Sequence, residues 1–413
     1  MDLMGKRWGR TAGLVFLLAV EAWSQGQKPA ATTPAPPAPA ATVPASPAPG
    51  QTRPAAPAQA PAPQSPTGQA APPAAVKTPA AELVWSVNLE KGAPEVPGMD
   101  VPRNAQRSAV IAGDRVVAVY SIGAEVSRGG RPVDTYRMVS LDLGTGAVKG
   151  EKKLELHSFP YLFATGDDHV LLGRSSLTRY NPDLTESGER FVEPGQGWIS
   201  CISPDGNTLA RWTEGGRGTG DGGTSDRGTE LISATTLTWT SGLIRGAEPS
   251  SVSGAVLLTD DPFWARQFPG DASFVTLVDR GRPRLLYRGN CGGRPEFLSG
   301  EKILSIACGK AKVMDTAGRA LKEITLDAPH GRFGGVSRDG SRFAIETSGY
   351  PPNDPAYGAT EMITVYDGTS FEAVTTVQLD RDSDTRPWTA FASDGHLFLS
   401  GSANRLSLYR IPF

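Results

Sequence analysis

A short unit of strand, tight polar turn and strand recurs along the chain and limits what it can fold into. Copies lie at residues 109–120, 161–173, 198–212, 296–308, 333–346 and 388–401, with a degenerate copy at 251–261. Three of the turns contain an Asp-Gly pair, namely Asp205-Gly206, Asp339-Gly340 and Asp394-Gly395. Glycine adopts positive φ at little cost, as a tight hairpin requires. The repeat therefore predicts a succession of antiparallel hairpins.

A second hairpin unit follows most of these copies, and the two together predict a four-stranded antiparallel sheet. The second units lie at 138–154, 176–192, 231–244, 274–287, 311–326 and 362–379. We therefore predict an all-β domain over residues 83–413, built as a seven-bladed β-propeller. Its blades average about 47 residues, close to the ~40–50 of such repeats. A propeller of six or eight blades and a two-sheet sandwich are the alternatives.

The last repeat holds three strands, at 388–393, 396–401 and 405–411, and so lacks an outer one. The segment LVWSVNL at 83–89 is an apolar strand with no partner nearby in the sequence. We expect it to pair with 405–411, which would close the ring and remove an open sheet edge.

The repeat motifs resemble those of known propeller families. The SPDG turn at 203–206 is similar to turns of WD40-like and TolB-like propellers. A second resemblance, to the repeats of quinoprotein-like propellers, is carried by Trp85 together with Leu141-Asp142 and Thr145-Gly146. The segment ITVYDGTSFEAVTTV at 363–377 resembles the repeats of the YVTN propeller family. The quinoprotein resemblance implies a bound quinone with calcium, but the adjacent cysteine pair of many such enzymes is absent. The resemblance therefore implies a fold and no binding residues.

The first 82 residues predict export followed by a spacer. Basic residues precede an apolar run at 12–20, and Ala22-Trp23-Ser24 places small residues for a cut before Gln25. This pattern predicts a signal peptide over 1–24 and a secreted or periplasmic protein. An uncleaved anchor is the alternative, although the run is shorter than the roughly 20 residues of a spanning helix. Residues 25–82 are expected to be a disordered linker, because 28–81 holds 16 Pro and 19 Ala.

The charge balance of the mature chain argues against binding of nucleic acid through a large basic surface. Removal of residues 1–24 leaves 38 basic and 41 acidic side chains, a net charge of −3. Such a near-neutral chain offers no broad basic surface for nucleic acid. We expect a monomer without a membrane span after cleavage.

The connections between the second and third strands of each blade share one face, and four of them are long. They cover residues 121–134, 214–229, 262–271 and 348–361. Because loops vary without disturbing a sheet, we predict that this face and the channel mouth are the functional surface. Aromatic and arginine side chains are the usual interface anchors. The candidate contact residues are Arg128, Arg131, Phe263, Trp264, Arg266, Tyr350 and Tyr357.

The cysteines and histidines provide no recognisable catalytic or metal motif. The hairpin register makes a Cys291–Cys308 disulfide a candidate, and Cys201 is expected to be a free thiol in an apolar strand. There is no C-x-x-C, H-E-x-x-H or G-x-S-x-G, so we assign no catalytic, cofactor or metal residues. We predict a binding or scaffolding module for an envelope or extracellular protein, a peptide or a saccharide. The alternative is a hydrolase or lyase for a saccharide or peptide, with a site assembled from several blades.

Overall fold

The computed structural model describes residues 79–89, 108–126, 132–156, 160–173, 176–192, 197–213, 228–245, 248–259, 273–289, 294–348, 362–378, 388–402 and 405–412. The chain divides into two units, Met1–Pro73 and Ala74–Phe413, and all described residues belong to the second. Within these ranges, no helix is long and apolar enough to cross a membrane.

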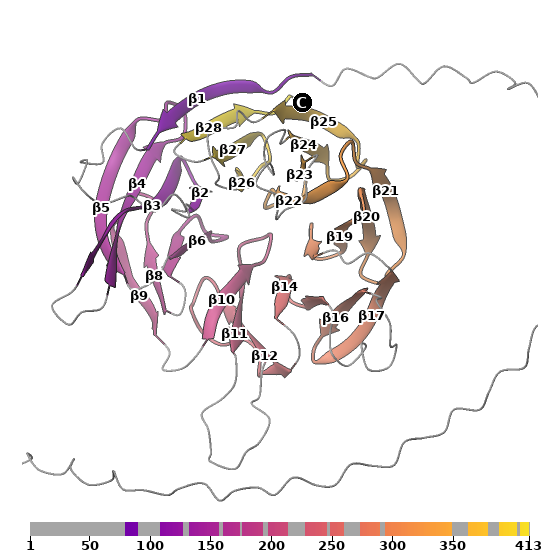
Figure 1. The fold of residues 1–413 in the computed structure, drawn as a ribbon. Helices are drawn as coiled ribbons and strands as arrows, with labels where there is room; N and C mark the ends of the chain where they lie inside the picture. The colour runs from indigo at the N-terminus through magenta and orange to yellow at the C-terminus, as the bar shows by residue number, and fades with distance from the viewer. Residues whose placement is uncertain are drawn as a thin grey trace, which may run out of the picture. The chain divides into compact units, whose positions relative to one another are not determined.

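The described strands form seven four-stranded antiparallel sheets, which are the blades of a β-propeller (Figure 1). Blade 1 contains β2 (Ser108–Ala112), β3 (Arg115–Val126), β4 (Pro132–Asp142) and β5 (Val148–Leu156). Blade 2 contains β6 (Tyr161–Ala164), β7 (Val170–Gly173), β8 (Ser176–Tyr180) and β9 (Glu186–Val192). Blade 3 contains β10 (Gly197–Ile202), β11 (Thr208–Thr213), β12 (Gly228–Ser233) and β13 (Ile244–Arg245).

The remaining blades repeat this order from the inner to the outer strand. Blade 4 contains β14 (Pro249–Val252), β15 (Val256–Thr259), β16 (Ser273–Asp279) and β17 (Arg282–Gly289). Blade 5 contains β18 (Pro295–Phe297), β19 (Lys302–Ala307), β20 (Lys310–Asp315) and β21 (Ala320–Thr325). Blade 6 contains β22 (His330–Val336), β23 (Arg342–Ser348), β24 (Met362–Asp367) and β25 (Ala373–Gln378). Blade 7 contains β26 (Trp388–Phe391), β27 (Leu397–Ser402), β28 (Arg405–Arg410) and β1 (Glu82–Asn88).

Strand β1 lies beside β28, with Ser86 opposite Ser407 and Asn88 opposite Arg405. It begins at Glu82, one residue before the predicted segment. Trp85 is 8% exposed, and its indole Nε1 donates a hydrogen bond to the Leu143 carbonyl of blade 1 at 2.8 Å. The strand that pairs with blade 7 therefore also packs against blade 1.

The hydrophobic core is divided among the interfaces between neighbouring blades. In the described ranges each interface has its own cluster of buried side chains, such as Phe343 and Ile345 with Leu304 between blades 5 and 6. The second strand of a blade is buried on both of its faces. In β23, for example, the consecutive residues Phe343, Ala344 and Ile345 are all buried. Outer strands such as β21 alternate between exposed and half-buried positions. Face-to-face packing of the blades thus explains both patterns.

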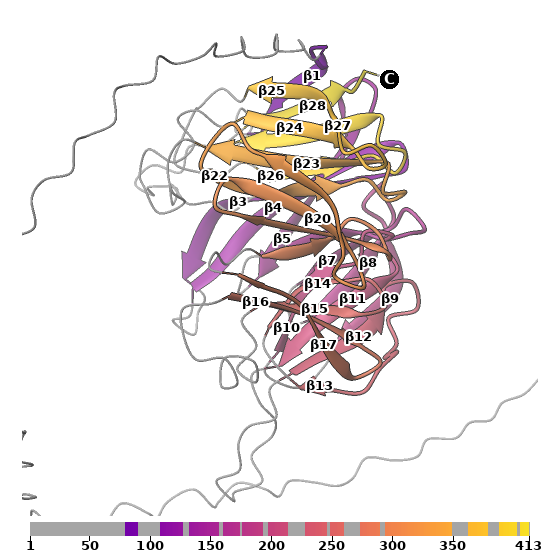
Figure 2. The same ribbon diagram turned by 90° about the vertical axis from the view of Figure 1, so that its right-hand side faces the viewer.

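The blades expose two different faces, which can be distinguished in Figure 2. We call turn face the side that carries the tight turns between first and second and between third and fourth strands. We call loop face the opposite side, where second strands connect to third strands. Inner strands run from the loop face to the turn face, so Arg338, which follows β22, lies on the turn face.

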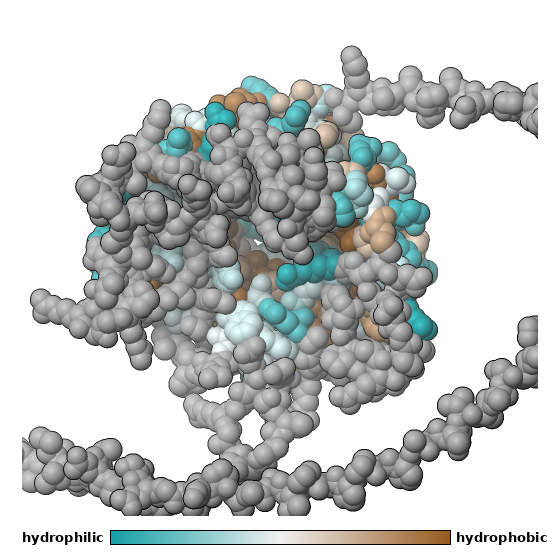
Figure 3. Space-filling model, in the orientation of Figure 1, coloured by the Kyte–Doolittle hydropathy of each residue, from teal (hydrophilic) through white to brown (hydrophobic). Residues whose placement is uncertain are grey.

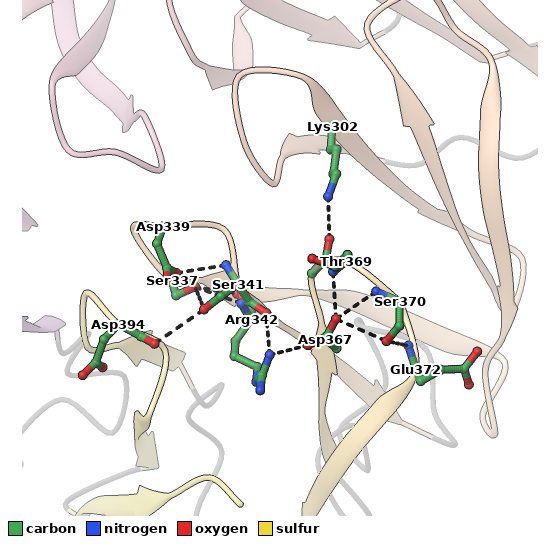
Figure 4. A network of polar contacts seen from close by, with 11 residues as sticks. Lys302, Ser337, Asp339, Ser341, Arg342, Asp367, Thr369, Ser370, Glu372 and Asp394 are labelled. Carbon is green, nitrogen blue, oxygen red and sulfur yellow. Dashed lines mark hydrogen bonds and ion pairs between the residues drawn. The ribbon is translucent and has the colours of Figure 1, made fainter. Parts of the chain in front are cut away.

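The turns after the inner strands of blades 2, 3 and 6 share one hydrogen-bonding pattern, in which a Thr or Ser hydroxyl donates to an Asp two residues later. At the SPDG turn, the Ser203 hydroxyl and the Asn207 N–H donate to the Asp205 carboxylate, and Gly206 has φ +72°. Burial acts to raise the pKa of Asp205, but these hydrogen bonds outweigh it and hold the pKa below its usual value. A related network joins the turns of blades 5, 6 and 7 (Figure 4).

The prediction that residues 121–134 form a loop is wrong for most of that range. Strands β3 and β4 continue through residues 121–126 and 132–134, with Val126 opposite Pro132. Ile122, Ala124 and Val126 alternate with smaller or polar residues, and a register shift between Ser121 and Gly123 accommodates the glycine. The segment is therefore an extended hairpin, and the register shift between Ser121 and Gly123 is a bulge within its ladder.

Gly146 provides a test of the contact between β1 and blade 1. It has φ +70°, and a Cβ there would lie 2.9 Å from the Trp85 ring. Gly254 has φ +69° with no atom within 4 Å, so it shares the backbone strain without the contact. We expect Gly146→Ala to lower the free energy of unfolding by about 1–3 kcal/mol more than Gly254→Ala, as measured by urea denaturation. Equal losses would show that Trp85 does not pack against this turn.

Candidate functional site

The sequence-predicted contact residues lie outside the described part of the chain. These are Arg128, Arg131, Phe263, Trp264, Arg266, Tyr350 and Tyr357. The predicted loops 214–229, 262–271 and 348–361 are also outside it, apart from Gly228 and Thr229 in β12 and Ser348 at the end of β23. The described part of the chain places the inner strands around the axis of the ring.

The inner strands of all seven blades enclose a central cavity of about 220 Å³. A hollow is visible at the centre of the ring in Figure 3, which shows the loop face. Most of the lining is apolar, including Phe163, Phe297, Phe333 and Phe391 from four different blades. An apolar cavity with a few polar groups is the usual character of a small-molecule site.

Glu296 on β18 is the carboxylate in the described lining of this cavity. Its side chain is 17% exposed, because it faces the cavity while protein surrounds it. Burial raises the pKa of Glu296 to about 7, against the opposing effects of Arg294 and of the Ser251 hydroxyl. The Arg294 Nε lies 3.5 Å from the Glu296 carboxylate, but that arginine side chain is 64% exposed and its charge is screened by water.

Arg338 crosses the turn-face end of the cavity. It belongs to blade 6, and its guanidinium donates to the Gly166 carbonyl and the Asp168 carboxylate of blade 2, both at 2.9 Å. The Gly166 N–H in turn donates to the Gly206 carbonyl of blade 3 at 3.0 Å. The turns of blades 2, 3 and 6 are thus joined across the axis, so the cavity is obstructed at this end.

The loop-face ends of the inner strands carry aromatic and charged side chains. Trp198 at the start of β10 donates a hydrogen bond from Nε1 to Glu248 at 3.2 Å, just before β14. Arg294 directly precedes β18, and Arg332 is the third residue of β22. In the described ranges, no group of three or more His, Cys, Asp or Glu side chains is placed to hold a metal ion.

Two of the three cysteines, Cys201 and Cys308, lie in the described part of the chain. Cys308 is in a disulfide, whereas Cys201 is free and partly buried. Burial raises the pKa of Cys201 to about 12, so the thiol is protonated at neutral pH. Cys291 lies outside the described residues, and its pairing with Cys308 stays a prediction.

No family model matches this chain, and no curated protein matches it. Solved structures are similar to it at low identity. A chain of "Crystal Structure of Mitotic Checkpoint Complex" is 11% identical with a TM-score of 0.46, covering 86% of this chain and 99% of its own. BamB from Moraxella catarrhalis is 11% identical with a TM-score of 0.37, at 80% and 99% coverage. The WD40 β-propeller domain of Doa1 is 12% identical with a TM-score of 0.46, at 80% and 97% coverage. No residue is transferred from these structures.

Neither Glu296 nor Arg338 was among the residues predicted from the sequence. Glu296 stands between a proline and a phenylalanine in a short strand, and a single carboxylate among apolar residues is a detectable signal. Arg338 occupies the position in its SRDG turn that Pro204 occupies in SPDG, and both line the cavity. Its partner on blade 2 is 170 residues away, so only the ring geometry shows the contact.

The raised pKa of Glu296 predicts how stability depends on pH. Its folded pKa of about 7 lies above its ordinary value of 4.5, so the folded state retains a proton that the unfolded state loses between these values. Stability contributed by the protonated acid is therefore present at pH 4.5 and lost as pH rises through 7, on the order of 3 kcal/mol. Chemical denaturation at pH 5 and pH 8 should show a smaller loss in Glu296→Gln than in the parent protein. An identical loss in both would contradict the assignment.

Proposed function

We propose that residues 82–412 form a non-catalytic binding module whose ligand occupies the central cavity and enters from the loop face. The observation that carries this proposal is an apolar cavity lined by all seven inner strands and crossed by Arg338 at its turn-face end. In the described lining Glu296 has no second carboxylate beside it, and paired carboxylates are the arrangement that glycoside hydrolysis requires. A binding role therefore fits the cavity better than a hydrolytic one.

The proposed setting is the periplasm or the extracellular space. The charged start, apolar run and small residues before Gln25 support export, and the Ala/Pro-rich residues 25–82 support a spacer between the cut and the domain. We also propose that β1 is the strand that closes the ring in the exported protein. Its pairing with β28 and the Trp85 contact with blade 1 support this role.

The loop face keeps its proposed role as the surface that receives an envelope or extracellular partner. Support comes from the length of the connections there, together with the arginine and aromatic residues they carry, from Arg128 to Tyr357. The chain enters β1 from the turn-face side, where the Thr375 hydroxyl donates to the Pro79 carbonyl at 2.7 Å. An attachment through the linker would therefore approach the face opposite the loops.

A fragment screen with cavity variants tests the proposed function. We would measure binding of neutral, cationic and anionic aryl compounds to the exported protein by ligand-observed NMR. Ala390→Phe fills the cavity, whereas Leu321→Phe adds the same ring at an exposed position on β21. Hits that disappear in Ala390→Phe and persist in Leu321→Phe are expected. No hits, or hits that survive in Ala390→Phe, would show that the cavity is not the binding site.

A further inference from the structure

The Glu296 carboxylate in the cavity is only partly neutralised by a neighbouring positive charge. Glu296 lines the cavity, and its pKa stays raised even though Arg294 is near. The Arg294 Nε is 3.5 Å from the carboxylate and its guanidinium is mostly exposed, so the pair is weakened by solvent. A buried carboxylate in this situation is stabilised by a cation brought into the cavity.

Arg338 does not provide that counter-charge. Its guanidinium is used at the turn-face end by the Asp168 carboxylate and the Gly166 carbonyl. It is paired with an acid of its own, so among the described residues the mostly exposed Arg294 is the cation near Glu296. An anionic ligand would therefore meet a carboxylate whose charge is only partly compensated by Arg294.

The remainder of the lining fits an apolar body. Val110, Ile202, Phe333 and Val336 are half-buried apolar residues of the lining, from blades 1, 3 and 6. A dry apolar cavity of about 150 Å³ accepts benzene, and this one is larger, at about 220 Å³. The negative faces of aromatic rings also attract a cation. Size and lining together suit a compact aryl or alkyl group.

We propose that the central cavity binds a small primary amine, with its ammonium at Glu296 and Ser251 and its aryl or alkyl body against the apolar lining. This inference rests on the proposed function, because it names the ligand class of the same cavity. The Ser251 hydroxyl is the neighbouring polar group, and it already accepts a hydrogen bond from the Phe297 N–H at 3.1 Å. Its lone pairs and the carboxylate together provide acceptors for an ammonium donor.

Isothermal titration calorimetry with three probes of one shape tests the ligand class. The probes are benzylamine, benzyl alcohol and phenylacetate, titrated into the full exported protein at pH 8, where Glu296 is ionised. We expect benzylamine to bind at least tenfold more tightly than benzyl alcohol and phenylacetate to bind most weakly. In Glu296→Gln the advantage of benzylamine over benzyl alcohol should disappear, while benzyl alcohol keeps its affinity.

The outcomes separate the two proposals. If benzyl alcohol binds as well as benzylamine and loses its binding in Ala390→Phe, the cavity is a site but the amine inference is overturned. If benzylamine keeps its advantage in Glu296→Gln, the carboxylate does not hold the ammonium and the inference is again overturned. If none of the probes binds, the proposed function itself fails. A thermal unfolding curve of Glu296→Gln that matches the parent at pH 5 establishes that the variant is folded.

Discussion

Replacement of Trp85 by alanine is expected to lower the free energy of unfolding by about 3–5 kcal/mol, measured by urea denaturation. Its indole ring is buried between blade 7 and blade 1, and its Nε1–H satisfies the Leu143 carbonyl. The substitution removes the ring, leaves a cavity and frees that carbonyl. Because both blades use the same side chain, the loss should affect the cooperativity of the whole ring.

Leu83 on the same strand is the matched control. It is 53% exposed, so Leu83→Ala should change the free energy of unfolding by less than about 0.5 kcal/mol. Removal of residues 79–89 should have a larger effect than Trp85→Ala, because it also exposes the edge of β28. A truncated protein with the stability of the full chain would show that β1 has no part in closing the ring.

Replacement of Arg332 by methionine is the second substitution with a large expected effect. Arg332 on β22 lies directly opposite Glu346 on β23 and donates a hydrogen bond from Nε to its carboxylate. Glu346 is 3% exposed, so the substitution removes an ion-pair partner from a buried carboxylate. We expect the free energy of unfolding to fall by about 3–5 kcal/mol at neutral pH.

The double variant Arg332→Met with Glu346→Met distinguishes loss of the ion pair from loss of packing. Apolar side chains in both positions remove the uncompensated charge, so the double variant should recover much of the stability. Lys310 and Glu323 form an exposed pair, and Lys310→Met should change stability little. A double variant less stable than Arg332→Met would contradict this account.

The hairpins could be predicted from the sequence because their turns are encoded locally. Asp205-Gly206 supplies both the side-chain acceptor and the positive φ that the turn needs, and Asp339-Gly340 repeats it. The outer strand of blade 3 is shorter than its pattern suggests, since β13 contains only Ile244–Arg245. There the Thr240 N–H donates to the Leu231 carbonyl from an irregular segment, which replaces part of the ladder.

The cavity could not be predicted, because its walls come from strands that are far apart in the sequence. Phe163 and Phe391 are ordinary members of alternating strands, and only the ring order brings them around one axis. The bond from Arg338 to Asp168 has no local signal for the same reason. Local patterns therefore determine the blades, whereas the candidate site depends on their closure.

A disulfide crosslink between β1 and β28 tests that closure most directly, since a cavity lined by seven inner strands requires the two ends of the domain to meet. Ser86 and Ser407 lie opposite each other with their hydroxyl oxygens 3.0 Å apart. Oxidation of the exported Ser86→Cys/Ser407→Cys variant should produce a single intramolecular crosslink between these positions, identified by peptide mass mapping. The account predicts near-complete crosslinking in the folded protein and none after unfolding in denaturant before oxidation. Absence of the crosslink in the folded protein would contradict the closed ring.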